Sequence, residues 1–383
     1  MDRILKTHLI SDLTHKIVLL MGARQCGKTT LAKKLTSSFD YLNYDSAEHR
    51  LILRQKIWDR HKSLIIFDEL HKMKNWKQWL KGVYDTEGIP PQYLVTGSAR
   101  LDIHRKMGDS LAGRYFSYRL HPLDLKEATL FLSQTPAILF ETLWHCSGFP
   151  EPFLEGNETY YKRWRKTHLD IILRQDLLDL YTVKDIKNIE TLVELLKTRI
   201  GSSISYANLA RDLEVDASTI KRWLELLENL YVIFKVTPYS NNIARSLLKE
   251  PKYYFYDHTY AGDDKGARLE NIVACALIKE LEYIEDTTGK NTSLHYLRTN
   301  DGKEVDFLIC IDSKATHIIE VKWADTNPAS GFKHFSSYFP QAKCIQLVKE
   351  CTRNITFPPN VNQKNQLEVL SLIPWLCAVP LDI

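Results

Sequence analysis

The most informative stretch of this 383-residue chain is Gly22-Ala23-Arg24-Gln25-Cys26-Gly27-Lys28-Thr29, which matches G-x-x-x-x-G-K-[ST] at every defined position. It follows an apolar segment that we expect to be a strand (residues 16–21) and opens a stretch with a helical pattern (residues 29–35). Glycines let the backbone N–H groups of such a loop turn toward phosphate oxygens, and the helix N-terminus adds partial positive charge. The stretch therefore predicts a phosphate-binding loop.

The loop also predicts which groups the ligand meets. Lys28 places a positive charge on the β- and γ-phosphates of a nucleoside triphosphate, and the hydroxyl of Thr29 is expected to bind Mg²⁺. A chance glycine-rich turn would not require a strand before it and a helix after it. The predicted nucleotide-binding residues are Gly22, Ala23, Arg24, Gln25, Cys26, Gly27, Lys28, Thr29 and Thr30.

Two adjacent carboxylates follow the next apolar run, which spans residues 63–67. Asp68 is expected to hold Mg²⁺ through water, and Glu69 to orient and activate the attacking water. A pair of acids after a strand can also be an ordinary solvated strand end. Their position about forty residues after Lys28 favours the functional interpretation, in which Lys28 and Glu69 are catalytic and Thr29 and Asp68 bind the metal.

Two further residues are candidates for the same site. Ser98 follows an apolar run (residues 93–96), and ligands of open α/β sheets bind beyond the carboxyl ends of the strands. Its hydroxyl is expected either to contact the γ-phosphate or the attacking water, or only to support its turn. Arg114 precedes the strand expected at residues 115–120 and is either an arginine finger or nucleotide sensor, in cis or in trans, or a surface residue.

The hydrophobic pattern divides the chain into three parts. Residues 1–135 alternate buried strands with amphipathic helices, which predicts a mostly parallel α/β sheet. Residues 136–240 are mainly helical, with long patterns at 157–181 and 186–200. Strands return at 231–236, 253–256, 304–311, 317–321 and 344–348, with a helix near 267–281, so residues 241–383 are expected to form a third, mixed α/β domain.

The helical part contains a helix-turn-helix pattern. Residues 204–213 and 219–230 are the two expected helices, with Ser205 and Ser218 as N-caps, and the strand at 231–236 follows as a wing would. Lys221 and Arg222 are suited to contact DNA phosphates or bases, whereas acidic residues on the same helix oppose this. DNA contact and a protein-interaction or spacer role both remain open.

Three charged residues interrupt two apolar strands near the C-terminus. Asp306 lies near the start of one strand, and Glu320 and Lys322 lie two residues apart on the next, so their side chains share a face. Charges in an apolar strand are costly unless they are paired or bind a metal. This pattern, with Glu270 on the preceding helix, resembles the PD-(D/E)XK nuclease fold, although no proline precedes Asp306.

That resemblance implies a metal-dependent site in which Asp306 and Glu320 bind Mg²⁺ and Lys322 positions water, with Glu270 as an additional acid. The predicted catalytic residues of this domain are Glu270, Asp306, Glu320 and Lys322. The competing interpretation is a buried Glu320–Lys322 ion pair with a solvated Asp306. Such domains also occur as inert modules, so cleavage and simple binding are both retained.

Composition excludes several classes of protein. The 51 basic and 47 acidic residues give a net charge of +4, which is too small to indicate nucleic-acid binding by itself. The seven cysteines are widely spaced without a C-x-x-C pair, which argues against a disulfide framework or a zinc ribbon and favours a reducing compartment. We expect a cytoplasmic protein without a membrane segment, because we find neither a signal pattern nor a long apolar run.

The ordered series of motifs resembles the prokaryotic AAA-type P-loop ATPases that carry an uncharacterised C-terminal domain. The matching segments are residues 22–29, 67–72 with Trp76, 95–98, 111–114, 122–123, 148–150, 174–176, 238–239, 269–271 and 320–322. The resemblance implies ATP and Mg²⁺ as cofactors, and hydrolysis of ATP. The role of the family is largely unassigned, so the resemblance does not say what the ATP is used for.

The predicted architecture is an AAA-type parallel sheet (residues 1–135), a helical and winged-helix section (136–240) and a nuclease-like α/β domain (241–383). The predicted function is a Mg²⁺-dependent ATPase coupled to a C-terminal region that binds or cleaves DNA. The alternative is a nucleotide-gated switch or scaffold whose inert C-terminal domain binds a protein partner. Self-association is required if Arg114 acts in trans.

Overall fold

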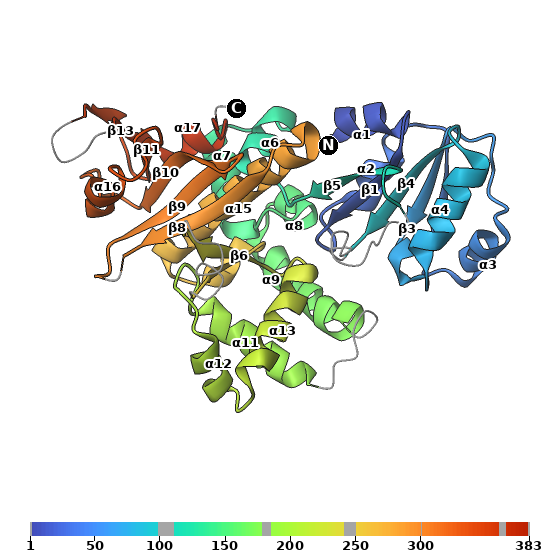
Figure 1. Ribbon diagram of the computed structural model, residues 1–383, viewed down its shortest axis with the longest axis horizontal. Helices are drawn as coiled ribbons and strands as arrows, with labels where there is room; N and C mark the ends of the chain where they lie inside the picture. Colours follow the sequence, from blue (N-terminus) through green and yellow to red (C-terminus); the bar gives the residue numbers. More distant parts are fainter. Residues whose placement is uncertain are drawn as a thin grey trace.

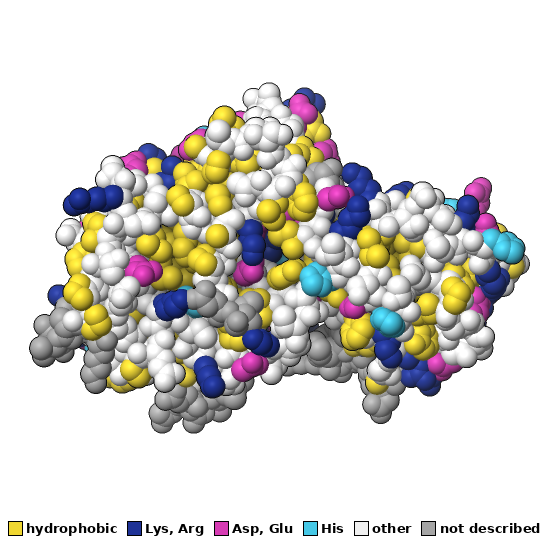
Figure 2. Space-filling model, turned by 90° about the horizontal axis from the view of Figure 1, so that it is seen from above, with side chains coloured by type: hydrophobic (Ala, Val, Ile, Leu, Met, Phe, Trp, Pro, Cys, Tyr) yellow, Lys and Arg dark blue, Asp and Glu magenta, His cyan; other side chains and the backbone are white. Residues whose placement is uncertain are grey.

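The computed structural model describes residues 2–98, 111–177, 185–240, 250–299, 301–359 and 365–381. Figure 1 shows three parts, namely a sheet with its helices at the right, a group of helices at the bottom, and a second, larger sheet at the left. On the face shown in Figure 2, acidic and basic side chains are interspersed, which agrees with the nearly balanced charge. None of the helices in the described part combines the length and the apolar character that crossing a membrane requires.

The first sheet has five parallel strands in the order β2-β3-β4-β1-β5. The strands are β1 (Ile17–Gly22), β2 (Phe39–Asn43), β3 (Leu64–Asp68), β4 (Gln92–Gly97) and β5 (Tyr115–Leu120). Its helices are α1 (Lys6–Leu13), α2 (Lys28–Lys33), α3 (Ala47–Gln55) and α4 (Trp76–Glu87). Every residue of β1 and β3 is buried, as expected for strands covered on both faces.

The predicted parallel α/β fold is therefore confirmed for this part. The expected strands lie within one or two residues of the observed ones, but β2 was missed. Its five residues are mostly half-buried, because β2 lies at the edge of the sheet and lacks a continuous apolar run. Since all five strands are parallel, their carboxyl ends meet at one edge, where residues 22–29, Asp68 and Ser98 follow β1, β3 and β4.

The middle of the chain is helical as expected, with α6 (Leu125–Phe131), α7 (Pro136–Cys146), α8 (Pro150–Glu155), α9 (Glu158–Ile171), α11 (Ile186–Lys197), α12 (Tyr206–Asp212) and α13 (Ala217–Asn229). The helix predicted at 157–181 is helical from Glu158 to residue 177, with a π-helical turn at Ile172–Asp176, and residues 178–181 lie outside the described ranges. Ser205 occupies the N-cap position of α12. Ser218 does not cap α13, because that helix starts at Ala217 with Asp216 at the N-cap position.

The second sheet has eight strands in the order β12-β13-β11-β10-β9-β8-β6-β7. These are β6 (Ile233–Pro238), β7 (Lys252–Phe255), β8 (Thr292–Arg298), β9 (Glu304–Ile311), β10 (Lys314–Lys322), β11 (Lys343–Val348), β12 (Ile355–Phe357) and β13 (Leu367–Ser371). The strand expected as a wing is β6, which pairs with β7 and, at its end, with β8. The hairpin that follows α13 is thus continuous with this sheet rather than a separate ribbon.

Helix α15 (Lys265–Thr288) joins the two sheets. It packs along β7, β8 and β10, and its C-terminal half reaches β5 of the first sheet, where Arg119 forms ion pairs with Glu285 and Asp286 at 2.6 Å each. Figure 1 shows α15 behind β8 and β9, running toward the N-terminus of the chain. Short helices complete this part: η3 (His258–Ala261), α16 (Ser330–Phe335) and α17 (Leu372–Leu376).

Candidate functional site

The glycines of the 22–29 loop are required by the backbone around them. A Cβ atom on Gly22 would lie 2.1 Å from the carbonyl oxygen of Leu120, so no larger residue fits where β5 passes the loop. Gly27 has φ +98° and stands directly before α2, a left-handed conformation that L-residues with side chains rarely adopt. The loop therefore turns into the first amide groups of α2, which is the geometry that binds phosphate.

Lys28 is held in place before any ligand arrives. Its side chain is buried, and Nζ donates hydrogen bonds to the carbonyl oxygens of Gly22 at 2.9 Å and Ala23 at 2.8 Å. The ammonium group therefore lies against the same loop whose amides would bind phosphates. The predicted role of Lys28 in binding phosphates stays a prediction.

Three hydroxyl groups fix the carboxylate of Asp68. Thr29 donates to Oδ2 at 3.0 Å, Tyr41 donates to Oδ2 at 2.5 Å, and Thr96 donates to Oδ1. Thr29 and Asp68, the two Mg²⁺ residues predicted in the first domain, are thus neighbours. Tyr41 was not predicted, because the strand that carries it was missed. Burial and the Asp68 carboxylate raise the pKa of Tyr41, so it remains a hydrogen-bond donor at neutral pH.

Glu69 follows Asp68 with φ +53°, a left-handed conformation that ends the extended backbone of β3. Ser98 donates to Glu69 Oε2 at 3.2 Å, and His71 Nε2 lies 3.5 Å from the same oxygen. Burial, with smaller contributions from the charges of Lys72 and Lys28, lowers the pKa of His71 to about 4, so its imidazole is neutral at pH 7. Ser98 therefore contacts Glu69 directly, and its predicted contact with phosphate or water stays a prediction.

These groups surround one cavity of about 530 Å³. The loop and α2 form one wall, and Asp68, Glu69 and Ser98 lie together on its lining. The opposite wall comes from α8 of the helical section, which supplies Pro150, Glu151 and Leu154. Sequence patterns did not predict this wall, because nothing in the short helix α8, far beyond β4 in the sequence, indicates that it folds back over the loop.

Residues that lie far away in the sequence also contact the 22–29 loop. Buried Arg3 donates to the carbonyl oxygen of Cys26 at 2.8 Å and pairs with Glu127 at 2.8 Å. His168 of α9, which stacks on the ring of Trp164, hydrogen-bonds the carbonyl oxygen of Arg24 at 3.1 Å. The phosphate loop is therefore in contact with the N-terminal segment and with the helical section.

Arg114 lies away from this cavity in its own chain. Its carbonyl oxygen accepts from the amide of Ile17, the first residue of β1, which places it at the opposite edge of the parallel sheet from the loop. Its guanidinium pairs with Asp85 at 2.7 Å. A role in cis is therefore not compatible with this geometry, and a role in trans stays a prediction.

The four residues predicted in the C-terminal domain do come together. Lys322 pairs with Glu320 at 2.6 Å, the amide of Asp306 donates to Glu320, and the amide of Val321 donates to Asp306. Glu270 of α15 lies close enough to contribute to the charge environment of Asp306. The second sheet thus gathers residues from α15, β9 and β10 at one place.

Three additional residues of this cluster were not predicted. Lys252 of β7 is buried and lies 2.6 Å from Glu304 and 3.3 Å from Glu270, and Tyr254 donates to Glu270 at 2.6 Å. Lys252 is a charged residue at the start of the otherwise apolar strand β7, and Lys322 was identified because it is a charged residue in an apolar strand. Lys252 was overlooked because its segment matches no known sequence motif. Lys252 is the larger omission, because its ammonium already neutralises part of the acidic cluster.

Carboxylates outnumber cationic groups in this cluster by one. Glu270, Glu304, Asp306 and Glu320 face Lys252, Lys322 and Arg298, whose guanidinium lies 3.5 Å from Glu304. Burial first, and then the charges of Glu270 and Glu320, raise the pKa of Asp306 well above its usual value, and burial also raises the pKa of Glu320. This excess suits a divalent cation bound by Asp306 and Glu320. However, in the described part of the chain no three His, Cys, Asp or Glu side chains are arranged as a metal site.

Three family models match consecutive parts of the chain. Residues 14–129 match the AAA domain family, residues 138–262 match a domain of unknown function (DUF8612), and residues 265–366 match another domain of unknown function (DUF4143). An uncharacterized protein of Mycobacterium tuberculosis is 27% identical over 304 residues, which cover 76% of this chain and 67% of the relative. One of Methanocaldococcus jannaschii is 24% identical over 385 residues, covering 91% and 83%.

Among solved structures, a signal transduction ATPase with numerous domains and a tetratricopeptide repeat sensor, from Pyrococcus horikoshii, matches with a TM-score of 0.24 and 13% identity. The match covers 73% of this chain and about half (47%) of that protein, and its TM-score is too low to show a shared overall fold. The family matches are the informative result. Residues 14–129 are thus similar to AAA domains, and residues 265–366 are similar to the DUF4143 domain.

Proposed function

We propose that the first domain binds ATP with Mg²⁺ and hydrolyses it. The observation that carries this proposal is that Lys28, Thr29, Asp68, Glu69 and Ser98 all line one cavity of about 530 Å³. The phosphate loop, a metal-binding hydroxyl and carboxylate, and a second carboxylate able to orient water are the parts that phosphoryl transfer to water requires. The match of residues 14–129 to the AAA domain family supports the same activity.

In this proposal each residue has a separate task. Lys28 and the loop amides bind the phosphates, and Glu69, positioned by Ser98, orients the water. Thr29 and Asp68 would hold Mg²⁺, which supplies charge neutralisation of the phosphates when bound. Pro150 and Leu154 of α8 offer an apolar surface for the base, so the nucleotide would contact both the sheet and the helical section.

The test compares two substitutions that should affect different steps, namely ATP binding and ATP turnover. Lys28→Ala should lose ATP binding, whereas Glu69→Gln should keep binding and lose turnover by about 10²-fold or more, because only the water-orienting group is removed. Arg54→Ala, an exposed change on α3, is the control. Turnover in Lys28→Ala equal to that of the parent would show that the assignment is wrong.

A second candidate function concerns the C-terminal cluster. We infer that Glu270, Asp306, Glu320 and Lys322 form a Mg²⁺-dependent site that cleaves nucleic acid, supported by their convergence and by the raised pKa of Asp306. The helices α12 and α13, with exposed Lys221 and Arg222, would then provide DNA contacts. The alternative is a nucleotide-gated switch in which Lys252 and Lys322 neutralise an inert cluster.

Plasmid incubation with Mg²⁺ or Mn²⁺, with and without ATP, distinguishes the two. Asp306→Asn keeps an acceptor for the amide of Val321 but removes the charge, and it should abolish nicking. Asp301→Asn, an exposed change in the turn before β9, should leave nicking unchanged. If no condition produces nicking in the parent protein, the switch is favoured.

A further inference from the structure

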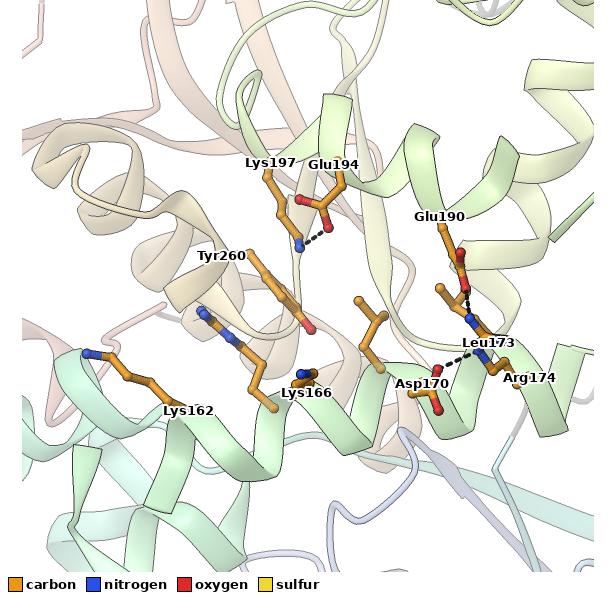
Figure 3. Close-up of a pocket in the computed structure, with 11 residues that line it drawn as sticks. Lys162, Lys166, Asp170, Leu173, Arg174, Glu190, Glu194, Lys197 and Tyr260 are labelled. Carbon is orange, nitrogen blue, oxygen red and sulfur yellow. Dashed lines mark hydrogen bonds and ion pairs between the residues drawn. The ribbon is translucent and has the colours of Figure 1, made fainter. Parts of the chain in front are cut away.

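A second cavity, of about 540 Å³, lies between α9 and α11 and shares no residue with the nucleotide cavity. Figure 3 shows side chains from both helices converging on it, with Tyr260 of η3 reaching in between them. Its basic residues are Lys162, Arg165, Lys166, Arg174 and Lys197. The lining also contains three acidic residues, so its basic residues exceed its acidic ones by two.

Each of the three acidic residues of this cavity forms an ion pair with a basic residue of the lining. Asp170 and Glu190 both pair with Arg174, at 2.5 Å and 3.0 Å, and Glu194 pairs with Lys197 at 2.6 Å, as the dashed lines of Figure 3 show. These contacts join α9 to its following turn and to α11. The carboxylates therefore serve as structural partners for two of the five basic residues.

The remaining basic residues are differently placed. Arg165 lies over the rings of Tyr161 and Tyr260, at 5.4 Å and 5.3 Å, which orders its guanidinium. Burial alone would lower the pKa of this guanidinium, but the nearby carboxylate of Asp257 contributes to raising it. Among the described residues, Lys162 pairs with exposed Glu158, its neighbour one turn earlier. The exposed ammonium of Lys166 has neither a hydrogen bond nor an ion pair within the described ranges, although its aliphatic part lines the cavity.

Tyr260 provides an independent indication of a ligand. Its side chain is only 8% exposed, yet its hydroxyl has no hydrogen-bond partner in the part of the chain that the structure describes. Figure 3 shows this hydroxyl directed toward the face of α9 that carries Lys166. A buried hydroxyl without a partner is costly, because the hydrogen bond that it made with water is lost. Burial also raises the pKa of Tyr260, so the group remains a donor.

We propose that this cavity binds the phosphate groups of an anionic ligand. Arg165, Lys166 and the Tyr260 hydroxyl are all donors, and a guanidinium, an ammonium and a phenol together match the several acceptor oxygens of one phosphate. The phosphates come either from the backbone of a nucleic-acid strand or from a small phosphorylated compound. Both present the same oxygens, and the two sources are separated by the probes below.

The experiment uses the full chain with Lys28→Ala, which removes phosphate binding at the nucleotide loop. One probe is a fluorescein-labelled 20-mer of thymidine followed by anisotropy, and the other is inorganic tripolyphosphate followed by calorimetry. Lys166→Glu is compared with Arg163→Glu, which reverses a charge on the same helix but does not line the cavity. Tyr260→Phe removes only the unpartnered hydroxyl and is not expected to destabilise the fold.

Binding of one or both probes should fall about 10-fold or more in Lys166→Glu and less than about 2-fold in Arg163→Glu, with a weaker salt dependence in the former. Tyr260→Phe should also weaken binding. Loss confined to the oligonucleotide identifies a nucleic-acid strand, and loss confined to tripolyphosphate identifies a small phosphorylated ligand. Binding of neither probe, or equal losses in Lys166→Glu and Arg163→Glu, would overturn the proposal.

Discussion

Lys279 Nζ lies 2.7 Å from Glu127 Oε2, and this ion pair connects α15 to the phosphate loop. The other oxygen of Glu127 accepts from Arg3, which in turn donates to the carbonyl oxygen of Cys26. A single buried carboxylate thus links the helix that carries Glu270 to the loop that carries Lys28. The nucleotide site and the C-terminal domain are therefore joined through charged groups in the interior.

Removing the charge of Glu127 should destabilise the protein strongly. In Glu127→Gln, buried Arg3 and Lys279 lose their shared partner, and breaking a buried pair in this way costs about 3–5 kcal/mol. Urea unfolding measures the change. Glu285→Gln removes a more exposed partner of Arg119 and should cost less than about 1 kcal/mol, so similar losses for the two variants would contradict this account.

The same residue predicts how stability depends on pH. Burial alone would favour the neutral acid, but Lys279 and Arg3 prevail and lower the pKa of Glu127 to about 2, from an ordinary value of 4.5. Because the pKa is lower in the folded state, the stabilisation is present above pH 4.5 and is lost as the pH falls toward 2, by about 3 kcal/mol in total. The free-energy difference between the parent and Glu127→Gln should therefore shrink over that range, and a constant difference would exclude the linkage.

His168 is predicted to act as a neutral hydrogen-bond donor to the loop. Burial lowers its pKa to about 4, despite the hydrogen bond to the carbonyl oxygen of Arg24, which acts in the opposite direction. His168→Phe keeps the stacking on Trp164 but loses this hydrogen bond, and we expect ATP affinity to fall by about 3- to 10-fold, the value of one hydrogen bond. Fluorescent nucleotide titration measures it, and unchanged affinity would show that His168 only fills space.

The wall formed by α8 predicts a contact between the nucleotide and the helical section. Leu154 is 54% exposed and lines the nucleotide cavity, so Leu154→Asp should weaken ATP binding about 10-fold, because an apolar surface is lost and a negative charge approaches the phosphates. Leu130→Asp is the matched control, since Leu130 is similarly exposed and does not line the cavity. Equal affinities of the two variants would place the base elsewhere.

Local patterns were sufficient to predict the residues that lie close in sequence to a motif. The loop at 22–29, Asp68, Glu69 and Ser98 all follow buried strands, and parallel strands bring such positions to one edge. Glu320 and Lys322 lie two residues apart on one strand, so the alternation of strand side chains is enough to predict that they share a face.

Residues whose partners are far away in sequence could not be predicted in this way. Arg3 contacts Cys26 and Glu127, which lie far away in the sequence. Leu154 of the helical section lines the same cavity as Lys28. Lys252 contacts Glu270 and Glu304 because β7 is part of the second sheet. Each depends on packing between segments, which no local period encodes. Tyr41 was missed for a different reason, since edge strand β2 has too weak an apolar pattern to be recognised.

Calorimetric titration of MgATP into the full chain tests the central claim most directly. We expect binding to one site per chain that disappears in Lys28→Ala and persists in Glu69→Gln. The absence of binding heat in the correctly folded parent protein at two temperatures, or binding that is unaffected by Lys28→Ala, would contradict it.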